Sequence, residues 1–270
     1  MTIVAAFLVP GSPLPTLRPD NAPWAALVAG YKKAGRALAA SKPDVLLIYS
    51  TQWIAVLDEL WQTRARVAGG HVDENWYDYG DLPYDIPVDR ALAEACVEGC
   101  RAIGIAAKGV DYDDFPIDSG TIVASGFLNA GAKVPIVIGA NNLYHDFPTT
   151  AKIAAMAAQK IAAQNKRAAV IGIGGLSGTI FRNEIDLAAD HVASEADDAW
   201  NRRMLGLFEK GSASEAERLS ADYAKAARVD MGFKHFAWIM GALGGRFKGA
   251  EVHGYGPTYG AGAAVVEFKL

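Results

Sequence analysis

Two apolar runs joined by a helical pattern constrain the fold of this chain more than any other feature. Residues 3–9 and 44–49 are nearly continuous runs of apolar and β-branched side chains. Between them, residues 23–40 place apolar side chains at the spacing of one helix face. Strands that are apolar on both faces and joined by a helix are typical of a parallel sheet covered on both sides. The pattern predicts an α/β fold.

The same alternation continues along the chain, without an internal repeat or a linker that would divide it. We therefore expect one domain over residues 1–270, with a mostly parallel or mixed central sheet and helices on both faces. Ser194 is expected to cap the helix at 195–209, and Ser214 and Glu217 have capping-box spacing. Further strands are expected at 105–108, 134–139, 168–172 and 263–268, and further helices at 88–103, 150–165, 195–209, 214–227 and 234–243.

The charge pattern argues against several classes of partner. The formal net charge is −4, and no run of Lys or Arg is present, so nucleic acid and anionic membrane surfaces are poor partners. No stretch approaches 18 uninterrupted apolar residues, so no membrane span is expected. The apolar start is short and lacks a basic region and a small-residue cleavage site, which favours a core strand over a signal peptide. We expect a cytoplasmic protein.

The two cysteines, Cys96 and Cys100, stand four residues apart within a predicted helix. Both therefore lie on one helix face, where a disulfide would have poor geometry. Two thiols are also too few for a structural zinc site. We expect both to be small buried side chains.

The ends of the predicted strands are the places to look for chemistry, because ligands of parallel α/β sheets bind beyond the carboxyl ends of the strands. The segments at 10–13, 50–53 and 174–178 hold almost nothing ionisable. The glycines at 172–175 only begin a dinucleotide fingerprint, and neither a phosphate loop nor a Gly-x-Ser-x-Gly elbow is present. No two of the five histidines have metal-ligand spacing, and each is more often structural: His71, His145, His191, His235 and His253.

A polar and aromatic stretch, residues 68–87, interrupts the α/β pattern. It contains Trp76, Tyr77, Tyr79 and Tyr84 among several acidic residues. Such a segment is too aromatic for disorder and too polar for a core. Two interpretations stay open here: an ordered surface excursion, or a lid or subunit contact.

Segments along nearly the whole chain resemble, in order, those of the class III extradiol ring-cleavage dioxygenases. They are AFLVPGSPLP, KPDVLLIYSTQW, FPIDSGTI, VPIVIGANN, KRAAVIGIGGLSG and HFAWIMGAL. The resemblance implies that family's fold. It also implies an activity that opens aromatic rings with O₂ at an Fe(II) ion, which two histidines and one glutamate hold.

The same resemblance marks where this chain departs from the family. It places the two histidine ligands at Gly11 and Gln52, and a third histidine, the acid/base group, at Gly178. The glutamate ligand falls at Asp230 or at Arg228. Glycine offers no ligand, a neutral amide is a weak one, and a single carboxylate does not make a site. We therefore expect a vestigial pocket with no catalytic residue, metal or cofactor on this chain.

The pattern of losses resembles family members in which a full-length inactive chain pairs with an iron-bearing homologue that cleaves an o-aminophenol. It implies a non-catalytic, stabilising α subunit, with Fe(II) on a homologous β subunit and an α₂β₂ assembly. Two alternatives stay open. The chain could bind a small aromatic in its metal-free pocket. It could also use Tyr49, Gln52, Asp118 or Ser177 for another chemistry, although these show no nucleophile–base pairing.

Overall fold

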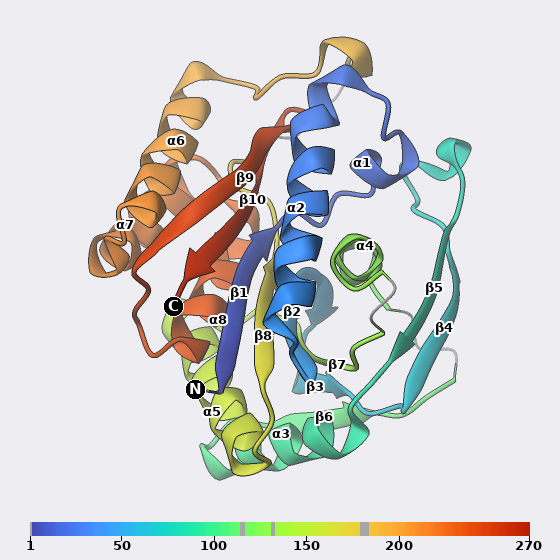
Figure 1. Ribbon diagram of the computed structural model, residues 1–270, viewed down its shortest axis with the longest axis vertical. Helices are drawn as coiled ribbons and strands as arrows, with labels where there is room; N and C mark the ends of the chain where they lie inside the picture. Colours follow the sequence, from blue (N-terminus) through green and yellow to red (C-terminus); the bar gives the residue numbers. More distant parts are fainter. Residues whose placement is uncertain (1, 114–116, 131–132, 179–183) are drawn as a thin grey trace.

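An eight-stranded sheet forms the centre of the computed structural model, which describes residues 2–113, 117–130, 133–178 and 184–270. The strand order is β6-β3-β7-β2-β8-β1-β10-β9 (Figure 1). The strands are β1 (Ile3–Val9), β2 (Val45–Ala55), β3 (Glu59–Gln62), β6 (Ala107–Val110), β7 (Ile136–Asn142), β8 (Ala168–Ile173), β9 (Gly249–Thr258) and β10 (Ala261–Lys269). Pairs within β7-β2-β8-β1 are parallel, whereas β10 joins β1 and β9 antiparallel. The prediction of a single α/β domain with a mixed sheet is confirmed.

Helices cover both faces of this sheet because successive strand residues point to opposite sides. Phe7 and Ile48 pack into one core with α2 and α4, and Leu8 and Leu47 pack into a second core with α3, α5, α7 and α8. The helices are α1 (Leu14–Leu17), α2 (Ala25–Ser41), α3 (Arg90–Ala102), α4 (Ser119–Leu128), α5 (Phe147–Ala163), α6 (Glu195–Glu209), α7 (Ala213–Ala226) and α8 (Lys234–Ala242). Short 3₁₀ turns are η1 (Ala22–Trp24), η2 (Tyr77–Tyr79), η3 (Leu187–Ala189) and η4 (Asp230–Phe233).

The predicted helix starts have different outcomes. The hydroxyl of Ser194 accepts a hydrogen bond from the backbone N–H of Asp197, 3.1 Å away, and α6 begins directly after it, as predicted. The predicted capping box at Ser214 and Glu217 is wrong. Helix α7 begins one residue earlier, at Ala213, so Ser214 already lies inside the helix. Its cap residue, Ser212, makes no capping hydrogen bond through its side chain in the part of the chain that the structure describes.

Several elements differ from the prediction. Strand β2 runs on to Ala55, six residues past the expected end, so Gln52 lies within the strand and not in a loop after it. The short strand β3, the helix α4 and the Gly-rich strand β9 were not predicted. The polar stretch at 68–87 contains most of a two-stranded hairpin, β4 (Arg66–His71) with β5 (Leu82–Pro87), which stands beside α4 (Figure 1).

Two simpler expectations concern burial. Cys96 and Cys100 are free and fully buried in the core beneath α3, as expected. Burial raises the pKa of the Cys100 thiol to about 12, and it raises that of Cys96 as well. Among the helices in the described ranges, none has the length and apolar character that crossing a membrane requires.

Candidate functional site: a pocket at the strand ends

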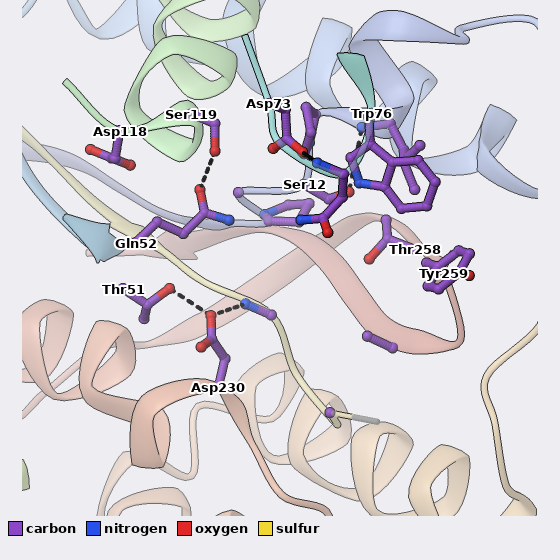
Figure 2. A pocket seen from close by; sticks show the side chains of 18 of the residues that line it. Ser12, Thr51, Gln52, Asp73, Trp76, Asp118, Ser119, Asp230, Thr258 and Tyr259 are labelled. Atoms are coloured by element: carbon purple, nitrogen blue, oxygen red, sulfur yellow. Dashed lines mark hydrogen bonds between the residues drawn. The ribbon is translucent and has the colours of Figure 1, made fainter. Parts of the chain in front are cut away.

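A cavity of about 1520 Å³ lies at the carboxyl ends of β1, β2 and β8. Its walls come from residues 10–14, the segment after β8 at 175–178, and the segment before α8 at 228–231. Residues 73–76 of the β4–β5 hairpin and the β9–β10 turn complete it (Figure 2). Gly11, Gln52, Gly178, Arg228 and Asp230 all line this cavity. The fold therefore brings the five positions selected from sequence to one place.

Gly11 and Gln52 face each other across the ends of β1 and β2. A Cβ atom on Gly11 would lie 3.2 Å from the carboxamide atoms of Gln52. The Gln52 carbonyl oxygen accepts a hydrogen bond of 2.9 Å from the hydroxyl of Ser119, at the start of α4 (Figure 2). The space between the two strand ends therefore holds a neutral amide whose oxygen is already in use.

The Asp230 carboxylate links two strand ends. Its Oδ2 atom accepts a hydrogen bond of 2.5 Å from the Thr51 hydroxyl on β2, and one of 3.1 Å from the backbone N–H of Gly175 after β8 (Figure 2). Burial raises the pKa of this carboxyl group, and the two hydrogen bonds partly offset that effect. Asp230 therefore acts as a hydrogen-bonded clamp between β2 and β8.

A strained backbone delivers Asp230 to this position. Arg228, Met231 and Phe233 have φ angles of 51°, 44° and 66°, in the left-handed region that costs L residues about 1–2 kcal/mol each. The Arg228 guanidinium donates to Asp197 over 2.7 Å and to the Gly178 carbonyl over 3.0 Å. Of the two candidates for the glutamate position, Asp230 thus has its carboxylate at the strand ends, whereas the Arg228 side chain is paired elsewhere.

Gly178 has no room for a side chain. Its backbone N–H donates to the carbonyl of Ala227 over 2.9 Å. A Cβ at this position would come within 2.5 Å of the Arg228 carbonyl oxygen, a contact that requires a backbone shift. The glycine therefore allows the segment after β8 to pack directly against the segment before α8.

These side chains do not fit an Fe(II) ion. Gly11 and Gly178 carry no donor atom, the Gln52 oxygen is bound by Ser119, and the Asp230 Oδ2 atom is bound by Thr51 and Gly175. Within the residues that the structure describes, no three His, Cys, Asp or Glu side chains are grouped so as to hold a metal ion. The family's two-histidine, one-carboxylate set has no counterpart at these positions.

The residues considered for another chemistry serve the fold. Asp118 caps α4, accepting from Ser50 over 2.5 Å and from the N–H and hydroxyl of Thr121 over 2.9 and 2.6 Å; burial raises its pKa. The Ser177 hydroxyl accepts from Asn201 over 2.8 Å. The Tyr49 hydroxyl donates to Asn141 over 2.8 Å. None of these partners is a base that could activate a nucleophile.

The polar and aromatic stretch at 68–87, here called the aromatic excursion, folds back over the cavity. Trp76 lines it, stacks on Tyr79 with a ring-centroid distance of 6.0 Å, and meets Tyr259 of the β9–β10 turn edge-on at 4.9 Å. Tyr77 remains exposed. Of the two interpretations left open, this geometry favours a lid for Trp76 and Tyr79.

Two functional positions were not selected from the sequence. The hydroxyl of Thr51 holds the Asp230 carboxylate, and the hydroxyl of Ser119 holds the Gln52 carboxamide.

The histidines lie in separate places. His71 lines the cavity, and His191 is exposed. His145 pairs with the buried Glu59 at 3.2 Å, and His253 lies between Glu251 and Glu267. His235 is fully buried, and neither ring nitrogen has a hydrogen-bond partner within the described ranges.

A family model described as the catalytic LigB subunit of aromatic ring-opening dioxygenase matches residues 10–267. The chain belongs to the LigB family. The resemblance to extradiol dioxygenases, carried by the motifs at the strand ends, is thereby confirmed. This LigB chain has Gly11, Gln52 and Gly178 at the positions where the resemblance implies histidines. The motif at 115–122 begins with Phe115 and Pro116, which lie outside the described residues.

Two relatives from Pseudomonas place this LigB chain more closely. It is 54% identical to a 2-aminophenol 1,6-dioxygenase alpha subunit, with 100% of each chain covered. It is 28% identical to a 2-aminophenol 1,6-dioxygenase beta subunit, over 99% of this chain and 94% of the relative. The crystal structure of an uncharacterized protein from Escherichia coli K12 matches with a TM-score of 0.67 at 12% identity, covering 98% of this chain and 99% of the other. That last likeness concerns the fold alone.

Proposed function

We propose that this chain is the non-catalytic, stabilising α subunit of a heteromeric dioxygenase that opens the ring of 2-aminophenol or a substituted analogue with O₂. The iron and the chemistry reside on a homologous β subunit, in an α₂β₂ assembly. The full-length identity of 54% to a chain described as an alpha subunit supports this role. The second relative, a beta subunit homologous to this chain, supports a partner of the same fold.

The observation that carries the proposal is the packing around Gly11, Gln52 and Gly178, the positions where the resemblance implies histidines. Gly11 meets the Gln52 carboxamide, and Gly178 meets the Arg228 carbonyl. An enzyme that had only exchanged its metal would keep donor atoms at these strand ends. Here a side chain at residue 178 would meet backbone, and the Gln52 oxygen and the Asp230 Oδ2 atom are held by hydrogen bonds, as expected of a chain whose chemistry is performed elsewhere.

Iron analysis of separately prepared chains tests the proposal. The isolated chain is loaded anaerobically with Fe(II), desalted and measured by elemental analysis, alone and after co-expression with the Pseudomonas β subunit. We expect no stoichiometric iron and no ring cleavage by the isolated chain. We expect one iron per αβ pair and higher, longer-lasting activity in the complex than in the β subunit alone.

Two results would contradict this proposal. One is a stoichiometric iron on the isolated chain at the strand ends. The other is a β subunit that forms a fully active homodimer with the same stability in the absence of this chain.

A second candidate function is the binding of a small aromatic molecule without turnover. The size of the remaining cavity favours it, together with Trp76 and Tyr259 at its wall. Titration of the isolated chain with 2-aminophenol, followed by calorimetry, tests it, with Trp76→Ala as the variant expected to lose binding. Absence of saturable heat in the wild-type chain would reject this candidate without affecting the first.

A further inference from the structure

An apolar patch lies exposed at the ends of β2 and β7. It consists of Ile54, Val56 and Leu57 from the end of β2 and the turn to β3, and of Leu143 and Tyr144 directly after β7. Leu57 is 88% exposed and Tyr144 79% exposed. Contiguous apolar patches on a protein surface often mark interaction sites. We call these five side chains the β2–β7 patch.

The fold holds the two halves of the patch side by side. Strand register pairs Ile54 with Asn141 and Ala55 with Asn142, and the Leu143 backbone N–H donates to the Ala55 carbonyl over 2.9 Å. Alternation along β2 turns Trp53 and Ala55 into the core and leaves Ile54 exposed, and Val56, directly after the strand, is exposed as well. An outward strand face is normally polar when it meets water. The patch is thus ordered before any partner arrives, which lowers the entropy lost on binding.

The charged residues at the edge of the patch already have partners within this chain. Asp58, which follows Leu57, pairs with Lys108 over 2.7 Å. Asp146, two residues after Tyr144, caps α5 by accepting from the backbone N–H of Thr149 over 2.9 Å. The patch is therefore an uncharged surface with polar groups at its edge, the composition found in the centre of stable interfaces.

We infer that the β2–β7 patch is the docking surface for the homologous iron-bearing subunit, an inference that rests on the proposed function. Its five side chains expose on the order of a few hundred Å², a large part of the roughly 800 Å² that each partner gives to a standard interface. A partner of the same fold carries the corresponding strand ends, so a pseudo-two-fold contact can use related surfaces on both chains. Ile54 also lines the cavity, so this contact extends to the pocket's rim.

The sequence offers another candidate for this interface, the stretch at 68–87 with Trp76, Tyr77, Tyr79 and Tyr84. In the structure the rings of Trp76 and Tyr79 stack on each other, and Trp76 also contacts Tyr259 at the cavity wall, so part of this stretch is already covered. Leu57 and Tyr144, in contrast, have most of their surface free. This difference is the reason to assign the contact to the β2–β7 patch.

Charge substitutions within the patch test the inference. Leu57→Lys and Tyr144→Asp are introduced singly into the full chain, which is then co-expressed with the tagged β subunit of 2-aminophenol 1,6-dioxygenase from Pseudomonas. Because both side chains are exposed, we expect unchanged far-UV circular dichroism and melting temperature. We expect the affinity for the β subunit to fall at least about tenfold for each variant, as for hot-spot residues. Tyr112→Asp, at an exposed tyrosine outside the patch, is the matched control and is expected to bind as the wild type does.

The outcomes separate the two levels of the proposal. If the wild-type chain binds and both patch variants bind equally well, or if Tyr112→Asp weakens binding as much, the docking surface is wrong and the proposed function stands. If the wild-type chain does not bind the β subunit, both fail. If the patch variants change only the self-association of the isolated chain, measured by analytical ultracentrifugation, the patch joins two copies of this chain and the inference is overturned.

Discussion

The carbonyl oxygen of Arg228 lies 2.5 Å from the point where a Cβ atom of residue 178 would stand. At the position where the family resemblance implies the acid/base histidine, this chain has a glycine, and the missing side chain allows two backbone segments to pack together. At Gly11 the neighbour is different, since a Cβ would meet the movable end of Gln52 at 3.2 Å. A side chain at residue 178 would displace backbone, whereas one at residue 11 would displace only the end of the Gln52 side chain.

Alanine at these two positions is expected to give unequal losses of stability. Gly178→Ala forces a backbone shift and is expected to cost about 1–3 kcal/mol, as overpacking does. Gly11→Ala is expected to cost less than about 1 kcal/mol, because the Gln52 side chain can rotate away. Urea unfolding measures both. Gly126→Ala, in α4 with open space around its Cβ, is the control and is expected to gain up to about 1 kcal/mol. Equal losses at 178 and 11 would contradict the difference in packing.

Adding two histidines tests the ligand positions that the family resemblance implies. Gly11→His together with Gln52→His introduces two imidazoles into the cavity that Asp230 also lines, and we expect a measurable gain in Fe(II) affinity by anaerobic titration. We expect little ring cleavage, because Gly178 still offers no acid/base group, and such groups contribute about 10²–10⁴-fold in rate. Single variants serve as controls. Turnover by the double variant alone, at the rate of the complete enzyme, would show that residue 178 is not limiting.

Removing the hydroxyl that holds Asp230 is expected to destabilise the chain. Thr51→Val leaves a partly buried carboxylate with one donor fewer, at a cost of about 1–3 kcal/mol at neutral pH. Because the pKa of Asp230 is already raised, its favourable contribution is complete below about pH 4, the unfolded value, and is lost as pH rises through the folded pKa. Loss of the hydrogen bond raises that pKa further. The stability gap between variant and wild type is therefore expected to widen with rising pH in urea titrations, and Thr51→Ser is expected to close it.

His235 is expected to make the fold sensitive to acid. Burial lowers its pKa to about 3, whereas the unfolded residue titrates near about 6.5. Between these values only the unfolded chain takes up the proton, so stability falls as pH falls, by about 1.4 kcal/mol per pH unit. From pH 7.5 to pH 5, His235→Leu is expected to lose about 2 kcal/mol less than the wild type, in urea unfolding at both values. His191→Gln, at an exposed histidine, is the control, and equal pH slopes in all three proteins would contradict the assignment.

The approach of Gly11 to Gln52 could be predicted from sequence, because the carboxyl ends of parallel strands share one edge of the sheet, whereas the family resemblance placed Asp230 or Arg228 there. The apolar runs also predicted the start of β2, and both ends of β1, β6, β7, β8 and β10 to within a few residues. Both results depend on patterns that local sequence carries directly, the period of side-chain burial and the order of the strands.

The backbone contacts around Gly178 could not be predicted in this way. The left-handed backbone at Arg228 and Met231, and its approach to Gly178, depend on how two loops pack in three dimensions. Strand β9 was missed because its glycines and its one proline weaken the strand pattern, although β10 pairs with it along its whole length. The patch residue Leu57 looks like core in a run of apolar letters, and only the turn that follows β2 exposes it.

The clamp at Asp230 has a consequence for the order of assembly. Metalloproteins whose strand ends are joined by an ion complete their fold only when the ion arrives, and a chelator can reverse that step. In this chain Thr51 and Gly175 supply the same connection from within the polypeptide. Its folding is therefore expected to be independent of iron, and its unfolding midpoint is expected to be unaffected by chelators. Such a chain would already be folded when it meets a newly synthesised partner subunit.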